Sequence, residues 1–195
     1  MTAKTFYGTS WQALDRARRQ VLQTVRAERE SPRRPGAVLY TTSRIKSPES
    51  ACRKLRQRGL PPTPQAALTR LRDTVGVRVI CAFQDDVYQM ARYLEERPEF
   101  AVLQTKDYIS HPKENGYRSY HLILGILEGP GKGVTVEVQL RTIATDCWAS
   151  LEHQIKYKRQ VPHEGLVREE LKRCADEIAS VDLSMETIRE LLEGA

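Results

Sequence analysis

The chain of 195 residues is 40% hydrophobic and 29% charged, a composition that suits one globular domain with at most a small appendage and excludes a disordered or collagen-like chain. No apolar run approaches the ~18 residues of a membrane-spanning helix, and the N-terminus lacks a signal-peptide stretch, so we expect a cytoplasmic protein. Residues 1–60 hold 14 Lys and Arg against 4 Asp and Glu. This segment suits a polyanionic partner, although an exposed basic helix would have the same composition.

Hydrophobic spacing and turn residues predict helices interspersed with strands. Ser47 and Pro48 supply an N-cap and a first-turn proline, whereas Pro61, Pro62 and Pro64 are expected to interrupt the chain. In chain order we expect a helix over 9–30, a strand over 37–42, a helix over 48–59, a strand over 75–83, a helix from 85 or 86 to 97, strands over 100–109, 118–126 and 134–141, a helix over 142–158, and one or two helices after residue 162. This order predicts an α+β, or mixed α/β, domain, and the spacing of the last two strands predicts a hairpin.

The four cysteines are widely separated and include no C-x-x-C pair. A zinc site or a disulfide framework is therefore not expected. We expect reduced, mostly buried thiols at Cys52, Cys81, Cys147 and Cys174.

Strict alternation over residues 134–141 places Glu137, Gln139 and Arg141 on one face of the predicted strand. A carboxylate, an amide and a guanidinium on one face would suit a site that binds a metal ion and a nucleotide. An ordinary half-exposed strand has the same pattern, so the strand alone does not decide between the two.

Two charged residues mark the strand over 75–83. Asp73 lies just before it and could either bind Mg²⁺ together with substrate phosphates or cap a turn. Arg78 lies inside it, so its charge must reach an open face of the sheet or be paired.

Residues 106–121 form the window richest in groups that suit a nucleotide. Its cations suit phosphate groups and its tyrosines offer flat faces for a base: Lys106, Lys113, Arg118 and His121, with Tyr108, Tyr117 and Tyr120. A polar surface loop is the alternative. No glycine-rich phosphate loop of the G-x-x-x-x-G-K-[ST] or G-x-G-x-x-G type occurs, so any nucleotide phosphates must be held by side chains.

Four segments carry a family resemblance: SRIKSPESACRK (43–54), DTVGVR (73–78), KDYISHPKENGYRSYH (106–121) and EVQLRTIATDCWASLEHQIKYK (137–158). Together they resemble the synthetase domain of the RelA/SpoT family, and in particular the small alarmone synthetases, which consist of that domain and little else. Each segment is unspecific alone, but four in the right order are highly specific. The likeness spans residues 37–160 and continues more weakly through the C-terminal helices.

The resemblance implies a nucleotidyltransferase-like mixed sheet flanked by helices over residues 1–160, which include the basic N-terminal helix, and C-terminal helices over 161–195. It also implies an activity, the transfer of the β,γ-diphosphate of ATP to the 3′-hydroxyl of GDP or GTP, which releases AMP and yields the alarmone (p)ppGpp. Mg²⁺ is the implied cofactor, held by Asp73 and Glu137. Glu137 is also the implied base for the 3′-hydroxyl.

The remaining roles that the resemblance implies fall on matching positions of this sequence. ATP would be held by Arg44 and Arg78, which sandwich the adenine, and by Lys46, Ser50 and Lys54 at its phosphates. Phosphate groups near the reaction centre would be held by Lys106, Lys113 and His121. The GDP or GTP acceptor would be bound by Tyr117, which stacks on the guanine, and by Gln139, Arg141, Asp146 and Glu152.

Asp146 departs from the family pattern, because close relatives often carry Asn at this position. Both side chains accept hydrogen bonds from guanine N–H groups, but only Asn also donates one to O6, so the ranking of GMP, GDP and GTP stays open. Long family members also carry an alarmone hydrolase domain with a His-Asp pair. No His-Asp dipeptide occurs here, so we expect no hydrolase activity.

Apolar residues at 167, 171, 174, 178, 181, 185, 188 and 192 follow an unbroken a/d-type spacing. This pattern fits a helix, or two helices broken near Ser180, packing on its own domain as well as it fits an oligomer seam. The resemblance favours the seam and implies a homotetramer built through these helices. A central cleft in such a tetramer would be a candidate site for RNA or (p)ppGpp as an effector.

Two other functions stay open. A related diphosphotransferase could use another acceptor, such as the 3′ end of tRNA, and the basic N-terminal third would suit it. A catalytically silent RNA- or nucleotide-binding module would have no use for Asp73 and Glu137, which are both present. An assay with labelled ATP and either GDP or tRNA separates these functions from alarmone synthesis.

Overall fold

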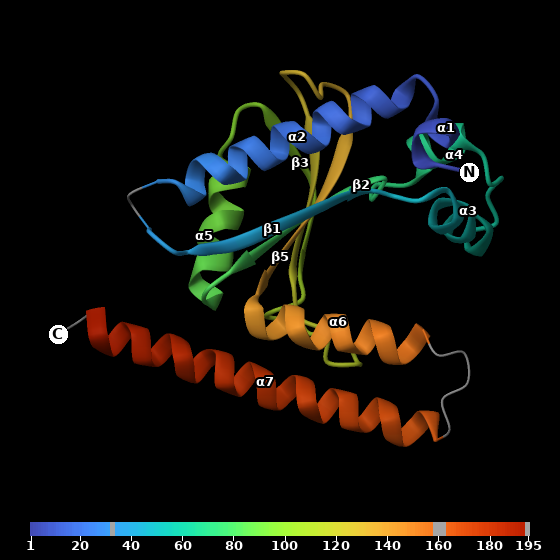
Figure 1. The fold of residues 1–195 in the computed structure, drawn as a ribbon. Coiled ribbons are helices and arrows are strands. Elements are labelled where there is room, and N and C mark those ends of the chain that lie inside the picture. Colours follow the sequence, from blue (N-terminus) through green and yellow to red (C-terminus); the bar gives the residue numbers. More distant parts are fainter. Residues whose placement is uncertain (32–33, 158–162, 194–195) are drawn as a thin grey trace.

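Five strands form one mixed sheet in a computed structural model of the chain, which describes residues 1–31, 34–157 and 163–193 (Figure 1). The sheet has the order β1-β2-β5-β4-β3, with β1 (Val38–Ile45), β2 (Val75–Cys81), β3 (Phe100–Asp107), β4 (Tyr120–Ile126) and β5 (Thr135–Thr142). β2 and β5 are parallel and the other neighbours are antiparallel, so β4 and β5 form the predicted hairpin. The expected α+β fold with a mixed sheet is confirmed.

Helices cover one face of this sheet and lie at both of its ends (Figure 1). Within the described residues they are α1 (Ala3–Tyr7), α2 (Ser10–Arg29), α3 (Pro48–Gln57), α4 (Pro64–Arg70), α5 (Gln84–Glu95), α6 (Ile143–Tyr157) and α7 (Glu164–Glu193). α2 and α5 pack on the same face of the sheet, and α6 and α7 lie side by side beyond the end at which β5 finishes (Figure 1).

The alternation of β2 separates the core from an open face of the sheet. The core residues that β2 contributes are Val75, Val77, Val79 and Cys81. Arg78 points to the opposite face, because successive side chains of a strand alternate. The parallel pairing with β5 sets Gly76 beside Glu137 and Arg78 beside Gln139. Two distant parts of the sequence therefore share the open face.

Most element boundaries agree with the prediction to within about two residues, and three larger differences stand out. β1 runs past residue 42 to Ile45, because its last residues still pair with β2. The prolines do not simply interrupt the chain, because α4 begins at Pro64 with Thr63 as its N-cap. The short helix α1, which is capped by Thr2, is missing from the prediction.

Residues 164–193 form one continuous helix, α7, without the break considered near Ser180. Other parts of the chain cover only the first half of the predicted apolar seam on α7. The seam residues that pack against Trp148 of α6 are Leu171, Cys174 and Ile178. The seam residues that are exposed are Val181, Met185, Ile188 and Leu192. The predicted helix end at residue 158 and the division between residues 160 and 161 lie outside the described residues.

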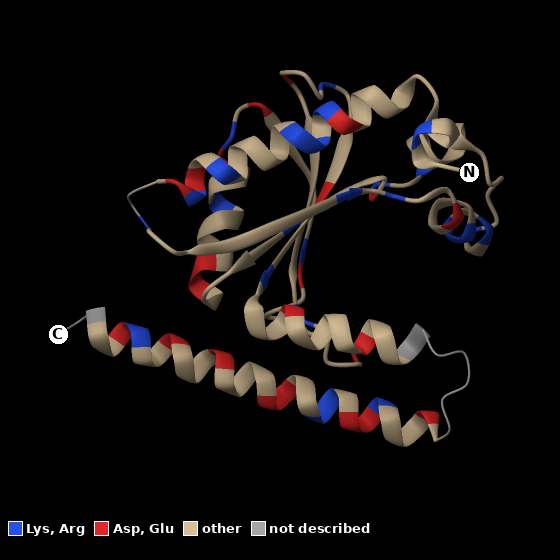
Figure 2. Ribbon diagram, in the orientation of Figure 1, with Lys and Arg blue, Asp and Glu red and all other residues tan. Residues whose placement is uncertain are grey.

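Basic and acidic side chains are concentrated on different helices. Lys and Arg are frequent on α2 and α3, and acidic side chains predominate along α7 (Figure 2). All four cysteines are free thiols, but only Cys81 is buried and Cys147 is exposed, so the expectation of mostly buried thiols is wrong. Burial raises the pKa of Cys81 to about 12. Among the described helices, none combines the length and apolar character needed to cross a membrane.

Candidate active site

A cleft opens on the face of the sheet opposite α2 and α5. Its volume is about 260 Å³, and its lining includes Arg44, Asp73, Arg78, Glu137 and Gln139. These residues come from β1, from the turn before β2, from β2 itself and from β5. The structure therefore brings together five site residues that the sequence predicts from three separate segments.

Asp73 is held between two lysines. Lys46 Nζ donates to its Oδ2 at 2.7 Å, and Lys54 Nζ donates to the same oxygen at 2.6 Å. Burial acts to raise the pKa of Asp73, but the hydrogen bonds from both lysines outweigh it, so the pKa lies below its ordinary value. Oδ1 is buried and has no hydrogen-bond partner among the described residues. One oxygen of an ionised carboxylate is thus left for a further ligand.

Glu137 lies on β5, and neighbours on β5 and β4 hold its carboxylate from two sides. Gln139 Nε2 donates to its Oε2 at 3.0 Å, and His121 Nδ1 lies 3.5 Å from its Oε1. Burial acts to raise the pKa of Glu137, as does the charge of Asp73, yet the contacts with His121 and Gln139 bring the pKa below its ordinary value. Glu137 is therefore ionised near neutral pH, and it is close enough to Asp73 for the two carboxylates to repel each other.

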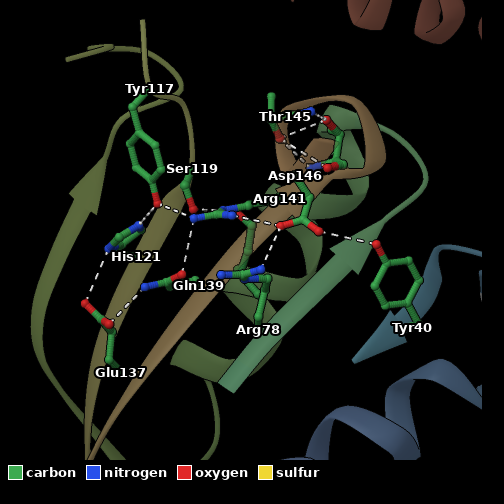
Figure 3. A network of polar contacts seen from close by, with 12 residues as sticks. Tyr40, Arg78, Tyr117, Ser119, His121, Glu137, Gln139, Arg141, Thr145 and Asp146 are labelled. Carbon is green, nitrogen blue, oxygen red and sulfur yellow. Dashed lines mark hydrogen bonds and ion pairs between the residues drawn. The ribbon is translucent and has the colours of Figure 1, made fainter. Parts of the chain in front are cut away.

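His121 on β4 joins Glu137 to Tyr117 (Figure 3). Burial lowers the pKa of His121 more than the neighbouring Glu137 raises it, so the ring is neutral near neutral pH. In the tautomer that fits its neighbours, Nδ1–H donates towards Glu137, and Nε2 accepts from the Tyr117 hydroxyl at 2.9 Å. Arg141 Nη2 donates in turn to the Tyr117 oxygen at 2.7 Å. A directed hydrogen-bond chain thus runs from Arg141 to Glu137.

Asp146, on the first turn of α6, connects the arginines of two strands (Figure 3). Its Oδ1 lies 2.8 Å from Arg141 Nη1 and 3.1 Å from Arg78 Nη1. Its Oδ2 accepts a hydrogen bond from the Tyr40 hydroxyl at 3.3 Å. Tyr40 is missing from the sequence prediction. If the predicted strand had been extended to Arg44, the alternation of side chains would have placed Tyr40 and Arg44 on the same face of the sheet.

The loop between β3 and β4 brings cations and tyrosines to the same region. Lys113 Nζ lies 4.7 Å from the centre of the Tyr108 ring and 5.1 Å from that of Tyr117. Glu152 of α6 accepts a hydrogen bond from Asn115 Nδ2 at 3.0 Å, so it holds this loop.

Other predicted residues lie around these groups. Lys106 pairs with His121 in the register of β3 and β4, which puts it on the same face of the sheet. Ser50 lies in the first turn of α3, where its backbone N–H donates to Ser47 Oγ. Arg118 is turned to α7, where it pairs with Asp176 at 3.1 Å. Its candidate role as a phosphate ligand in this structure is therefore not supported.

Tyr7 is a further residue that the sequence analysis missed. Its buried hydroxyl donates to the backbone oxygen of Lys46 at 3.1 Å. Burial, together with the charge of Asp73, raises the pKa of Tyr7 to about 12. The short helix α1 thus helps to hold the segment that carries Lys46, and no sequence pattern indicates this contact.

The donor set of the cleft suits a magnesium ion bound together with a nucleotide. No group of three or more His, Cys, Asp or Glu side chains within the described residues is placed to hold a metal by itself. Mg²⁺ is usually bound by one or two carboxylates together with substrate phosphates and water. Asp73, with its unpartnered buried oxygen, and the ionised Glu137 match that requirement.

Comparisons with known proteins agree with this geometry. A family model described as "Region found in RelA / SpoT proteins" matches residues 43–162. The GTP pyrophosphokinase YwaC of Bacillus subtilis is 40% identical over 142 residues, which cover 71% of this chain and 68% of that protein. The crystal structure of small alarmone synthetase 1 from Bacillus subtilis bound to its product pppGpp is similar with a TM-score of 0.76 and 32% identity, over 89% of this chain and 90% of that one.

A structure of a GTP pyrophosphokinase family protein from Streptococcus pneumoniae matches all of this chain and 97% of its own, with a TM-score of 0.82 and 29% identity. The family model covers more than half of this chain and includes Arg44, Asp73, Arg78 and Glu137. The chain therefore belongs to the RelA/SpoT family, among the small alarmone synthetases.

Proposed function

We propose that this chain transfers the β,γ-diphosphate of ATP to the 3′-hydroxyl of GDP or GTP, which yields (p)ppGpp and AMP. The observation that carries the proposal is the meeting of Asp73 and Glu137 in one cleft beside Arg44 and Arg78. The activity named for its relatives, GTP pyrophosphokinase, and the pppGpp bound to one similar structure support the same reaction.

The reaction forms a bond between the acceptor O3′ and the β-phosphorus of ATP. The bond from that phosphorus to the oxygen that bridges it to the α-phosphorus breaks, and AMP leaves with this oxygen. Glu137 takes the proton of the 3′-hydroxyl, because it is ionised near neutral pH and lines the cleft. Gln139 and His121 hold its carboxylate in one orientation. A positioned base of this kind contributes typically ~10²–10⁴-fold to the rate.

The donor side is built from cations. Arg44 and Arg78 flank the cleft, and a planar guanidinium can stack on adenine while it adds positive charge. Lys46 and Lys54, which pair with Asp73 here, reach the triphosphate of bound ATP from the same segment as Ser50. Positioning and charge neutralisation are what phosphoryl-type transfer needs most.

Mg²⁺ is the cofactor that we assign to this site, with Asp73 and Glu137 as the residues that would hold it. When bound, the ion supplies neutralisation of the phosphate charge that otherwise repels an incoming hydroxyl. Asp73 contributes the buried Oδ1, which has no protein partner among the described residues. The two lysines keep this carboxylate ionised and ready to bind a cation.

The acceptor side lies along β4, β5 and the loop before β4. Tyr117 stacks on the guanine, and its ring is held by its hydroxyl bonds to His121 and Arg141. The remaining acceptor and phosphate contacts that we propose are Lys106, Lys113, His121, Gln139, Arg141, Asp146 and Glu152. Asp146 accepts hydrogen bonds from the guanine N–H groups, as a carboxylate can.

Incubation of the purified protein with labelled ATP, Mg²⁺ and one acceptor at a time tests this function. GDP or GTP should yield labelled (p)ppGpp with one AMP for each product molecule. A product formed only with tRNA would assign the chain to the diphosphotransferases that use another acceptor. Nucleotide binding without any product would leave a catalytically silent module. Because both proposed substrates are cytoplasmic nucleotides, we place the reaction in the cytoplasm.

We also propose that the chain assembles as a homotetramer through α6 and α7. The exposed part of the seam, from Val181 to Leu192, would be covered by further copies of α7, and the exposed Ile143 and Leu151 add apolar surface on α6. RNA or (p)ppGpp bound between the subunits is the effector that we propose. Light scattering at micromolar concentration should give the mass of four chains, and a monomeric mass would contradict the assembly.

A further inference from the structure

The loop that carries Tyr117 rests on the C-terminal helix. The Arg118 guanidinium spans the contact: Nη1 donates to the backbone oxygens of Gly116 at 3.1 Å and of Ala175 at 3.3 Å, and Nη2 donates to Asp176 Oδ1 at 3.1 Å. One side chain thus binds the loop, the backbone of α7 and an acidic side chain of α7 at the same time. Its exposed fraction is 18%.

Gly116 brings the two backbones close together. Its φ is +86°, and a Cβ at this position would lie 2.5 Å from the Cβ of Ala175 and 3.4 Å from the Cα of Lys172. A side chain would therefore push the loop off the helix, and the positive φ favours glycine independently. This close approach places the Gly116 oxygen and the Ala175 oxygen within reach of one guanidinium.

The contact between the loop and α7 also determines which residues lie beneath the Tyr117 ring. Its ring packs against the buried cluster of Trp148, Ala149 and Ala175, which α6 and α7 build together. Trp148 Nε1 donates to the backbone oxygen of Leu171 at 2.8 Å and so joins the two helices. The position of the ring is therefore set by α7 as well as by its own loop.

We infer that Arg118 is a positioning residue for the guanine acceptor, because it anchors the Tyr117 loop on α7. The inference rests on the proposed function and deepens it. Arg118 does not touch the cleft, so it acts through Tyr117. The hydrogen bonds to the two backbone oxygens carry the effect, because an exposed ion pair contributes little, whereas a charged donor on a carbonyl contributes more. Asp176 itself is 47% exposed.

This assignment predicts an order among four variants. Arg118→Ala and Arg118→Lys both lose Nη1, which donates to the two backbone oxygens, and each should raise the KM for GDP about tenfold while the KM for ATP changes less than about twofold. Asp176→Asn should have a smaller effect on the KM for GDP. Arg173→Ala is the matched control, because Arg173 pairs with Glu170 at 2.9 Å on the exposed side of α7 and should leave both KM values unchanged.

Hydrogen–deuterium exchange provides a readout that needs no turnover. Arg118→Ala should accelerate exchange of the segment 111–119, while the segment 164–170 of α7 exchanges as in the wild-type protein. If the wild-type protein made no (p)ppGpp, the proposed function would fail. The exchange data would still show whether Arg118 holds the loop on α7. An active wild-type protein combined with an unchanged KM for GDP in both Arg118 variants would overturn the inference. An equal rise of both KM values would also overturn it, since that outcome means general loss of structure.

Discussion

Lys54 Nζ lies 2.6 Å from Oδ2 of Asp73, and Lys46 shares the same oxygen. Two residues that we assign to the ATP phosphates thus neutralise a carboxylate that we assign to the metal. The two lysines stabilise the charge of Asp73. They are also in place to bind phosphate as soon as ATP and its cation enter the cleft.

Lys54→Met tests the donor side. The change keeps an unbranched chain and removes one charged donor, so we expect the KM for ATP to rise about tenfold while the KM for GDP changes little. Steady-state kinetics with each nucleotide varied in turn provide the measurement. Lys132→Met, at an exposed lysine of the β4–β5 turn, is the control for a general loss of positive charge. Equal effects of the two changes would contradict a specific phosphate contact.

Tyr117→Ala tests base stacking on the acceptor side. Loss of an aromatic platform costs ~1–3 kcal/mol per stacked base, so the KM for GDP should rise about tenfold or more. Tyr117→Phe keeps the ring but removes the hydroxyl that joins Arg141 to His121. It should retain most of the GDP affinity and lower kcat, because His121 then holds Glu137 less firmly. An unchanged KM for GDP in Tyr117→Ala would remove the stacking assignment.

Arg78→Lys tests whether the guanidinium plane matters beyond its charge. Lysine keeps the positive charge but offers neither a stacking plane nor the same contact to Asp146, so the KM for ATP should rise about tenfold. Arg44→Lys should behave in the same way. Arg56→Lys, at an exposed position of α3, should have no effect. ATP affinity equal to wild type in both cleft variants would show that adenine is not held between these arginines.

Asp182 makes folding sensitive to pH at the contact between α7 and the end of β5. Burial raises the pKa of its carboxyl, and Glu186 adds to this, although the Thr142 hydroxyl donates to Oδ2 at 2.6 Å and acts in the opposite direction. A raised pKa in the folded state favours folding below the unfolded pKa, and this contribution is lost as the pH rises through the folded value.

Asp182→Asn removes the carboxyl whose ionisation destabilises the folded state as the pH rises, and it keeps an oxygen that accepts a hydrogen bond from Thr142. The variant should therefore have a higher midpoint of thermal unfolding than wild type near neutral pH, and the difference should shrink at about pH 4. Asp176→Asn is the opposite control, because Lys172 and Arg118 lower the pKa of Asp176 and its charge favours folding. Thermal melts across this pH range would contradict the account if the gain from Asp182→Asn grew on acidification.

Local patterns in the sequence predict much of the sheet, because strand alternation and capping residues act over a few neighbours. The alternation around Glu137 correctly separates its face from the buried valines of β5. The pairing of β2 with β5, which brings Asp73 to Glu137, has no local signal. The resemblance to a family predicted that meeting, and residue spacing did not.

Helix α4 and the contacts of Arg118 were not predicted, for two different physical reasons. α4 carried the same signal as α3, an N-cap residue followed by proline, and Thr63 with Pro64 could have been recognised as readily as Ser47 with Pro48. Arg118 could not have been placed. Its partners on α7 become neighbours only because the helix returns beneath the loop, and its charge alone suits a phosphate equally well.

Turnover by Asp73→Asn and Glu137→Gln tests the central claim most directly. Both changes keep the size of the side chain and remove a carboxylate from the cleft, so (p)ppGpp synthesis should fall about a thousandfold or more, while circular dichroism and ATP binding show a folded, nucleotide-binding protein. Glu128→Gln, at an exposed turn residue, should keep wild-type turnover. Near-normal synthesis by either cleft variant would contradict the proposal that these two carboxylates carry the reaction.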